Sequence, residues 1–188
     1  DWETLKNDCL ACQRCPLHTT RHNVVFGQGV ESAEVLFVGE GPGQSEDEQG
    51  LPSWDAAASC WTNTSLPSTS TVLQLHIANI VKCRPPPEPR PAARRERSLY
   101  AVAAGAVPAA AAQDRGLPWA RCRPADDPAG FFRYPGARQI IEKSGILFMG
   151  TFHPAALLRQ PQNKPEAFAD FTVLRDTIAS VCEHTYHK

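Results

Sequence analysis

The stretch that decides the fold is Ile77-Ala78-Asn79-Ile80-Val81-Lys82-Cys83-Arg84-Pro85-Pro86. Its first five residues form a short apolar run of the kind that makes a buried strand. Asn79 carries a donor and an acceptor in one plane, which suits reading the edge of a base. Cys83 is a soft ligand that could share a metal centre with Cys12 and Cys15, which stand in C-x-x-C spacing. The stretch therefore predicts a strand end with an amide and a metal ligand close together.

Two further apolar runs predict strands of the same kind. Residues 34–38 (E-V-L-F-V) are followed at once by Gly-Glu-Gly-Pro-Gly at 39–43, and residues 145–150 by Thr-Phe-His-Pro at 151–154. Continuous apolar runs are typical of strands that are buried on both faces. Residues 165–180 have helical apolar spacing, with Phe168 among the expected inward positions. The pattern predicts an α/β domain with its site at the carboxyl ends of the strands.

Length and composition limit the alternatives. The 188 residues suit one domain, residues 1–188, and a net charge of -1 gives no overall attraction to nucleic acid. No apolar stretch approaches the roughly 18–20 residues of a membrane span. No signal peptide opens the chain, so a cytoplasmic location is expected, and the missing initiator Met suggests a fragment or a trimmed start. Seven Cys with C-x-x-C spacing and no secretory signal favour metal over disulfides.

Two stretches lack any such pattern. Residues 53–75 show no periodicity, and residues 87–138 are rich in Pro, Ala and Arg with only scattered large aliphatics. Such composition usually marks a disordered insertion. A compact domain with two structureless gaps between core strands is nevertheless unusual.

Six motifs follow one another along the chain: C-x-x-C-P-L-H at 12–18, N-V-V-F-G-x-G at 23–29, L-F-V-G-E-G-P-G at 36–43, E-D-x-x-G-x-P at 46–52, N-I-V-K-C-R-P-P at 79–86 and T-F-H-P-x-x-L-L-R at 151–159. With these motifs the chain resembles the family 4 uracil-DNA glycosylases, the iron–sulfur type, over residues 1–52, 77–86 and 139–188. The resemblance implies a three-layer α/β/α fold with a mostly parallel central sheet, disrupted at residues 53–75 and 87–138. It implies a monomeric enzyme that hydrolyses the N-glycosidic bond of uracil in single- or double-stranded DNA and so starts base-excision repair.

The resemblance also implies roles for single residues. Asn79 reads the uracil edge, and Glu40 orients water or stabilises positive charge on the sugar. Gly41 and Pro42 bring the backbone of the turn close to the base. His153 donates to the uracil oxygen where negative charge grows. From the residues alone, a strand-end Asn, a glycine-rich phosphate loop or tight turn, and a structural His remain open alternatives.

Basic and apolar residues near the site predict DNA contacts. By resemblance, Leu157, Leu158 and Arg159 form a loop that wedges into the duplex, with Arg159 on a phosphate. The alternative is the first turn of a helix that packs on the core. His18, Arg21 and Arg84 could add contacts to the DNA backbone.

The resemblance implies a structural [4Fe-4S] cluster on Cys12, Cys15 and Cys83. The family's fourth ligand lies about sixteen residues after the third, where this chain has Leu99. Cys9 extends the motif to C-x-x-C-x-x-C and could compete for a place, whereas Cys60 and Cys122 have no motif context. Zinc would also accept these thiolates.

Two other departures accompany Leu99: Ser53 stands where the family has an aromatic, and the family's central Ile/Val-rich strand is missing. We hypothesise shifted reading frames at both irregular stretches. Trp has one codon, so the bases around Trp54 and Trp61 are nearly fixed. If the codons are read one base earlier, those of Trp54-Asp55 give Gly, those of Trp61-Thr62 give Asp, and Phe is allowed at 53. If the codons from Pro87 on are read one base later, a Cys codon is allowed across Leu99 and Tyr100. The alternative function is a catalytically impaired metal- or nucleic-acid-binding remnant.

Overall fold

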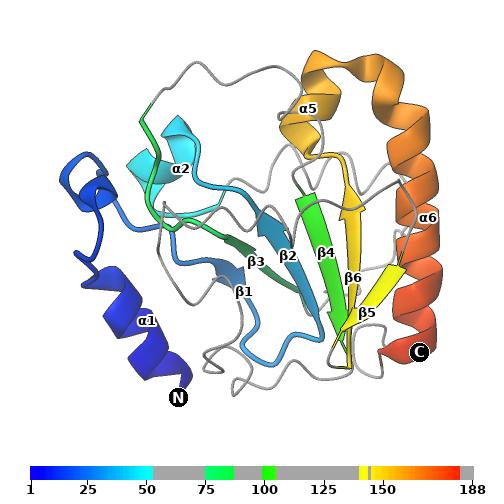
Figure 1. Cartoon of the computed structure of the whole chain (residues 1–188), viewed down its shortest axis with the longest axis horizontal. Coiled ribbons are helices and arrows are strands. Elements are labelled where there is room, and N and C mark those ends of the chain that lie inside the picture. Colours follow the sequence, from blue (N-terminus) through cyan, green and yellow to red (C-terminus); the bar gives the residue numbers. More distant parts are fainter. Residues whose placement is uncertain (53–74, 87–98, 105–139, 144, 183–188) are drawn as a thin grey trace.

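The computed structural model describes residues 1–52, 75–86, 99–104, 140–143 and 145–182. They form helices on a six-stranded sheet, an α/β arrangement (Figure 1). The elements, in chain order, are α1 (Trp2–Leu10), η1 (Pro16–Thr19), β1 (Gln28–Gly29), β2 (Val35–Gly39), α2 (Gln44–Gln49), β3 (Leu75–Asn79), β4 (Leu99–Ala104), β5 (Ile140–Lys143), β6 (Ile146–Thr151), α5 (Pro154–Arg159), η4 (Pro161–Asn163) and α6 (Lys164–Val181).

The strands lie in the order β1-β3-β2-β4-β6-β5. Strand β2 pairs parallel with β3, whereas β4 is antiparallel to both of its neighbours, β2 and β6. Two successive reversals leave β2, β3 and β6 pointing the same way. These are the three strands predicted from the apolar runs, with their bounds shifted by one or two residues. Their carboxyl ends therefore lie at one edge of the sheet.

The mostly parallel pairing implied by the resemblance is wrong for the described strands. Only β2 and β3 pair parallel, because β1, β4 and β5 are each antiparallel to the strand beside them. Strand β4, the run L-Y-A-V-A-A, lies between β2 and β6. A sequence without regular alternation of polar and apolar residues specifies neither direction nor register strongly, which allows the antiparallel pairing on both sides.

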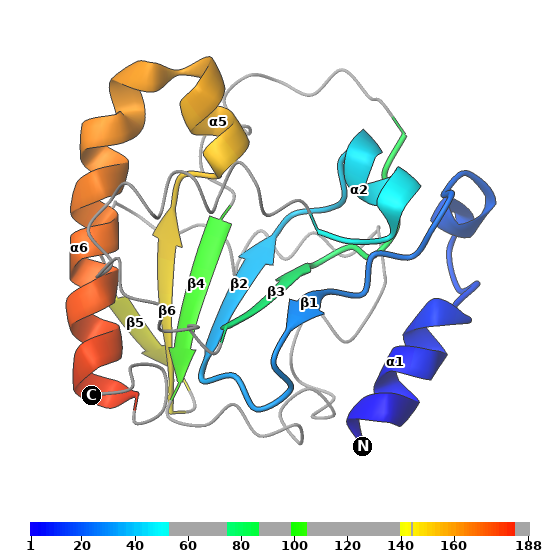
Figure 2. The same cartoon turned by 180° about the vertical axis from the view of Figure 1, so that it is seen from behind.

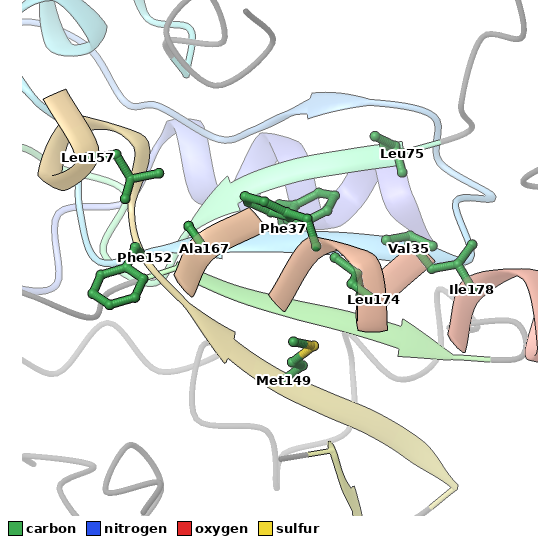
Figure 3. Packing of buried hydrophobic residues seen from close by; sticks show 10 residues of the cluster. Val35, Phe37, Leu75, Met149, Phe152, Leu157, Ala167, Leu174 and Ile178 are labelled. Atoms are coloured by element: carbon green, nitrogen blue, oxygen red, sulfur yellow. The ribbon is translucent and has the colours of Figure 1, made fainter. Parts of the chain in front are cut away.

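Helix α6 packs on one face of the sheet and forms the main core (Figure 3). Pro165 in its first turn is favoured there because proline lacks the N–H that a first turn leaves unpaired. The helix buries Ala167, Phe171, Leu174 and Ile178, whereas Phe168, predicted to face inward, is 47% exposed. The buried set lies against Val35 and Phe37 of β2, Leu75 of β3 and Met149 of β6.

A buried polar contact fixes the end of β6 to α6. The Thr151 hydroxyl donates to Asp170 Oδ2 at 2.9 Å, and both side chains are almost fully buried. Thr151 is the last residue of β6 and lies two residues before His153. The contact therefore sets where the chain leaves the sheet toward the predicted site.

Helix α1 lies at the opposite end of the sheet from α6, as the two views show (Figure 2). It begins with Asp1, whose side chain accepts from the Thr4 amide at 2.8 Å as an N-cap. The Trp2 ring meets the rings of Phe26 and His76 edge to face, with centroids 5.3 and 5.0 Å away. These aromatic contacts hold the helix against the β1–β3 side of the sheet.

Candidate active site and cysteine loops

The loops after β2 and β3 run side by side at the carboxyl edge. The Ile80 amide donates to the Gly39 carbonyl at 2.8 Å, and the Val81 amide donates to the Glu40 carbonyl at 3.1 Å. These bonds continue the parallel ladder beyond the strand ends, so the backbone of both loops is fixed. Glu40 and Asn79 are thereby carried on one rigid surface.

Asn79 is a buried amide at the end of β3. Its side chain is 6% exposed, and its Nδ2 has no hydrogen-bond partner in the described structure. Gly39 lies opposite in the ladder, and a Cβ there would collide with the Asn79 Oδ1. Only glycine lets the amide lie across the end of β2. Because a buried donor without a partner costs free energy, the site is suited to a ligand that supplies an acceptor.

The turn after β2 is held from both ends. Pro42 is buried, and Gly41 lies beside the ring of Pro85 from the loop after β3. The Gly43 amide donates to Glu46 Oε2 at 2.7 Å, which caps the start of α2. The structure therefore places Gly41 beside the loop that follows Asn79, the predicted uracil reader.

His153 lies half-buried where β6 leads into α5. Its carbonyl accepts from the amides of Ala156 at 2.8 Å and Leu157 at 3.2 Å. Burial lowers the pKa of His153 below its usual value; Glu46 and Glu40 act in the opposite direction, and Arg159 adds to the lowering. The lowered pKa favours the neutral ring, which keeps one N–H to donate. The same charges show that Glu40 and His153, predicted from distant motifs, lie near one another.

The predicted DNA-contacting trio divides between core and surface. Leu157 is 2% exposed and packs with Phe152 in the core cluster (Figure 3). Leu158 is 67% exposed, and Arg159 is exposed beside it. Leu157 therefore takes the alternative role of a core residue, because helical geometry turns successive side chains by about 100°. Only Leu158 and Arg159 are placed where DNA can reach them.

The cysteine loops are joined by Arg21. Its Nη1 donates to Cys83 Sγ at 3.1 Å and to the Cys12 carbonyl at 2.8 Å. Arg21 is half-buried, and these bonds give it a structural role beside the contact with the DNA backbone that it could make. Cys83 is 5% exposed, and Cys12 and Cys15 are half-buried. The Arg21 guanidinium therefore bridges the segment after α1, which holds Cys12, and the segment after β3, which holds Cys83.

Asp47 ties the end of the cysteine loop to α2. This fully buried carboxylate accepts from the His22 amide at 3.0 Å, from His22 Nδ1 at 2.8 Å and from the Asn23 amide at 3.4 Å. Burial acts to raise the pKa of Asp47, but the hydrogen bonds from His22 and Asn23 outweigh it and hold the pKa below its usual value. Asp47 thus fixes the chain between the two predicted sites.

The cysteine thiols are ligands of the type that an iron–sulfur cluster takes, but their side chains are only partly arranged to hold one. Soft thiolates are the ligands that such clusters take. Cys12, Cys15 and Cys83 come from segments that Arg21 joins. Yet within the described ranges no three His, Cys, Asp or Glu side chains are arranged as the ligands of one metal ion. The segments are placed for a cluster, and the side chains would have to turn toward it.

Three structural contributors were missed by the sequence interpretation. Gly39 makes room for Asn79, Arg21 joins the cysteine segments, and Asp47 fixes residues 22–23. Gly39 and Asp47 belong to the motifs at 36–43 and 46–52, so the sequence marks both positions. It does not predict which residues they contact. Ser53, Cys60 and Cys122 lie outside the described residues, as does most of both irregular stretches.

The edge of the α/β sheet thus carries a buried amide, a carboxylate and a half-buried histidine. The sequence profile of the uracil DNA glycosylase superfamily matches residues 26–173, so the chain belongs to this superfamily. This confirms the resemblance drawn from the motifs. None of the helices in the described ranges is long and apolar enough to cross a membrane.

Within the superfamily the chain is similar to type-4 uracil-DNA glycosylases. It is 44% identical to that of Thermotoga maritima over 75 residues, 40% of this chain and 39% of the relative. It is 40% identical to that of Sulfurisphaera tokodaii over 85 residues, 45% of this chain and 39% of the relative. It is 38% identical to that of Archaeoglobus fulgidus over 84 residues, 45% of this chain and 42% of the relative. The match spans about two fifths of each relative's length.

Proposed function

We propose that this chain is a type-4 uracil-DNA glycosylase, which hydrolyses the N-glycosidic bond of uracil in single- or double-stranded DNA and starts base-excision repair. The observation that carries the proposal is the buried Asn79 amide, whose Nδ2 has no partner in the described structure. Membership of the superfamily and the names of the similar proteins support it. The nearness of Glu40 and His153 adds two groups suited to the reaction.

The reaction begins when the nucleotide turns out of the duplex into the pocket. Asn79 donates from Nδ2 to a uracil oxygen and accepts from the ring N–H, which distinguishes uracil from cytosine. Gly41 and Pro42 let the backbone of the turn approach the base. Leu158 fills the vacated space in the duplex, and Arg159 holds a phosphate.

Bond cleavage places negative charge on the uracil and positive charge on the sugar. Neutral His153 donates its N–H to the uracil oxygen, where it stabilises the departing anion. Glu40 orients the attacking water or stabilises the cationic sugar. A donor that is already in place needs no reorganisation during the reaction, which is why the rigid strand ends are a suitable support.

We place this activity in one three-layer α/β/α domain, residues 1–188, that acts as a monomer in the cytoplasm. One face of the sheet is covered by α6. The other face carries a second apolar cluster of Val38 and Phe148, with Leu36, Ile80 and Ile146 packed against it. Apolar groups on both faces support cover on both sides.

A [4Fe-4S] cluster is the proposed cofactor, with Cys12, Cys15 and Cys83 among its ligands; zinc is the alternative. When bound, it supplies a rigid cross-link between chain segments and moves no electrons in base excision. Arg21 places the two segments, and Asp47 holds the chain that leads from them to β1.

The test is release of uracil from single- and double-stranded oligonucleotides that contain one uracil, beside matched strands with cytosine or thymine. Asn79→Ala should lower kcat/KM by about 10²-fold or more, because the polar groups of the base lose their partner. Asn163→Ala, an amide on the connection to α6, is the matched control and should keep full activity. Equal activity of the two variants would contradict the assignment of Asn79.

The alternative is a catalytically impaired metal- or nucleic-acid-binding remnant, and Ser53 and Leu99 favour it. Without the family's aromatic, stacking worth roughly 1–3 kcal/mol per base is lost. Sequencing the encoding DNA tests whether shifted reading frames explain Ser53 and Leu99. Shifted frames would be refuted if the DNA has no insertions or deletions that shift and restore the frame near residues 53, 76, 87 and 138. Uracil release by the chain and by Ser53→Phe decides the consequence, because equal activity would show that the lost aromatic does not matter.

A further inference from the structure

The proposed cluster lacks a fourth ligand at the family's spacing. Leu99 stands there, and a leucine side chain cannot bind iron. Leu99 is, moreover, the first residue of β4, and its backbone pairs with Thr151 in the sheet. A fourth thiolate must come from another part of the chain.

The described part of the chain holds one further cysteine on the same side as the three ligands. Its free cysteines are Cys9, Cys12, Cys15, Cys83 and Cys182. Cys182 follows α6 and packs against the main core, at the opposite end of the sheet from α1. Cys9 lies in the last turn of α1, directly before the Cys12 loop.

The backbone brings Cys9 and Cys12 into one turn. The Cys9 carbonyl accepts from the Cys12 amide at 3.2 Å, so a tight turn at the end of α1 joins the two residues. Cys9 is half-buried, and its thiol lies near enough to Cys12 and Cys83 for their charges to act on it. Cys9 therefore lies near both segments that Arg21 joins.

The surroundings of Cys9 suit a negatively charged cluster. Burial raises the pKa of the Cys9 thiol, and the positive charges of Lys82 and Arg21 act against that rise. Lys82 is held in place because its Nζ donates to the Phe26 carbonyl at 2.9 Å and its own carbonyl accepts from the Val25 amide at 2.8 Å. Four thiolates around iron leave net negative charge, which these two cations offset.

Helix α1 is fixed well enough to present a ligand. The ring of Trp2 packs edge to face on Phe26 and His76, and Asp1 caps the first turn. The helix spans only nine residues. Anchoring Trp2 at one end therefore limits how far Cys9, near the other end, can move.

We propose that Cys9 is the fourth thiolate of the iron–sulfur cluster and replaces the ligand lost at position 99. The ligand set is then Cys9, Cys12, Cys15 and Cys83, with three sulfurs from one short segment and one from the loop after β3. The inference rests on the proposed cofactor and is specific to this chain, because it depends on the C-x-x-C-x-x-C spacing together with Leu99.

The test uses the whole chain, loaded without oxygen from ferrous iron and sulfide. Iron and acid-labile sulfide per chain are measured, and iodoacetamide labelling of each cysteine is followed by mass spectrometry in the loaded and the metal-free protein. Loading should protect Cys9 from alkylation as it protects Cys12, Cys15 and Cys83. Cys182, the internal control, should be labelled equally in both forms.

Two variants complete the test. Cys9→Ser, which keeps the size of the side chain, should lose the cluster as Cys83→Ser does, whereas Cys182→Ser should retain the wild-type iron content. A loaded wild-type protein in which Cys9 is alkylated as fast as in the metal-free form overturns the Cys9 proposal and leaves the cofactor standing. A wild-type chain that takes up no iron and sulfide overturns the cofactor itself.

Discussion

The strand-end site and the cysteine loops differ in what holds them. Glu40, Asn79 and His153 follow strands, and their backbone is fixed by the ladder and by bonds between neighbouring loops. The cysteine loops are fixed by side chains, chiefly Arg21, Asp47 and Trp2. The first site exists before its ligand arrives, because a sheet built for other reasons supports it. The second would depend far more on the cluster that we propose for it.

The largest effect should come from the core beneath the strand-end site. Leu157→Ala should lower the free energy of unfolding by about 2–5 kcal/mol, because it leaves a cavity beside Phe152. Leu158→Ala, its exposed neighbour, should stay within about 0.5 kcal/mol and weaken only DNA binding. Chemical denaturation and a DNA-binding titration measure the two. Similar stability losses would show that the buried and exposed positions are misassigned.

The second-largest effect should come from removing His153, the proposed hydrogen-bond donor to uracil. His153→Ala should lower kcat by about 10²–10³, because one preorganised hydrogen bond to the departing uracil is removed. KM should change much less, since this bond strengthens only as charge develops. His22→Ala, a histidine of the cysteine side, should leave kcat unchanged. A fall confined to KM would assign His153 to substrate binding alone.

A glycine tests how rigid the strand-end site is. Gly39→Ala puts a methyl group against the Asn79 Oδ1 and forces the amide aside. A shift of about 1 Å can cost about 10²-fold in rate, so activity should approach that of Asn79→Ala. Full activity in Gly39→Ala would show that the loop can yield. Uracil release under single-turnover conditions is the measurement.

The smallest effect is a pH dependence on the cysteine side. Burial, and next the charge of Lys82, lower the pKa of His76 from 6.5 to about 4. The unfolded chain therefore binds a proton between pH 6.5 and 4 that the folded chain does not, and stability falls as pH falls, by at most about 1.4 kcal/mol per pH unit. Replacing the histidine in His76→Gln should flatten this slope. Urea denaturation at several pH values measures it, and an unchanged slope would assign the effect to other groups.

The two regions also differ in how far the sequence predicted them. The apolar runs located β2, β3 and β6 to within two residues, and polar residues directly after a strand must lie near its end. That made the convergence of Glu40, Asn79 and His153 predictable. Strand β4 was not predicted, because it lies in the irregular stretch 87–138 and its residues do not alternate as in a half-buried strand. The bonds of Arg21 were not predictable either, because its partners, Cys12 and Cys83, lie far apart in the sequence and only the fold brings them together.

The segment from Asn79 to Cys83 belongs to both regions. Only three residues separate the Asn79 amide from Cys83, and the Lys82 carbonyl fixes that short segment to Val25. A chemical change at Cys83 therefore acts on a segment that ends in Asn79. For the proposed glycosylase we expect oxidation of Cys83 to disturb the position of this amide before it unfolds the sheet.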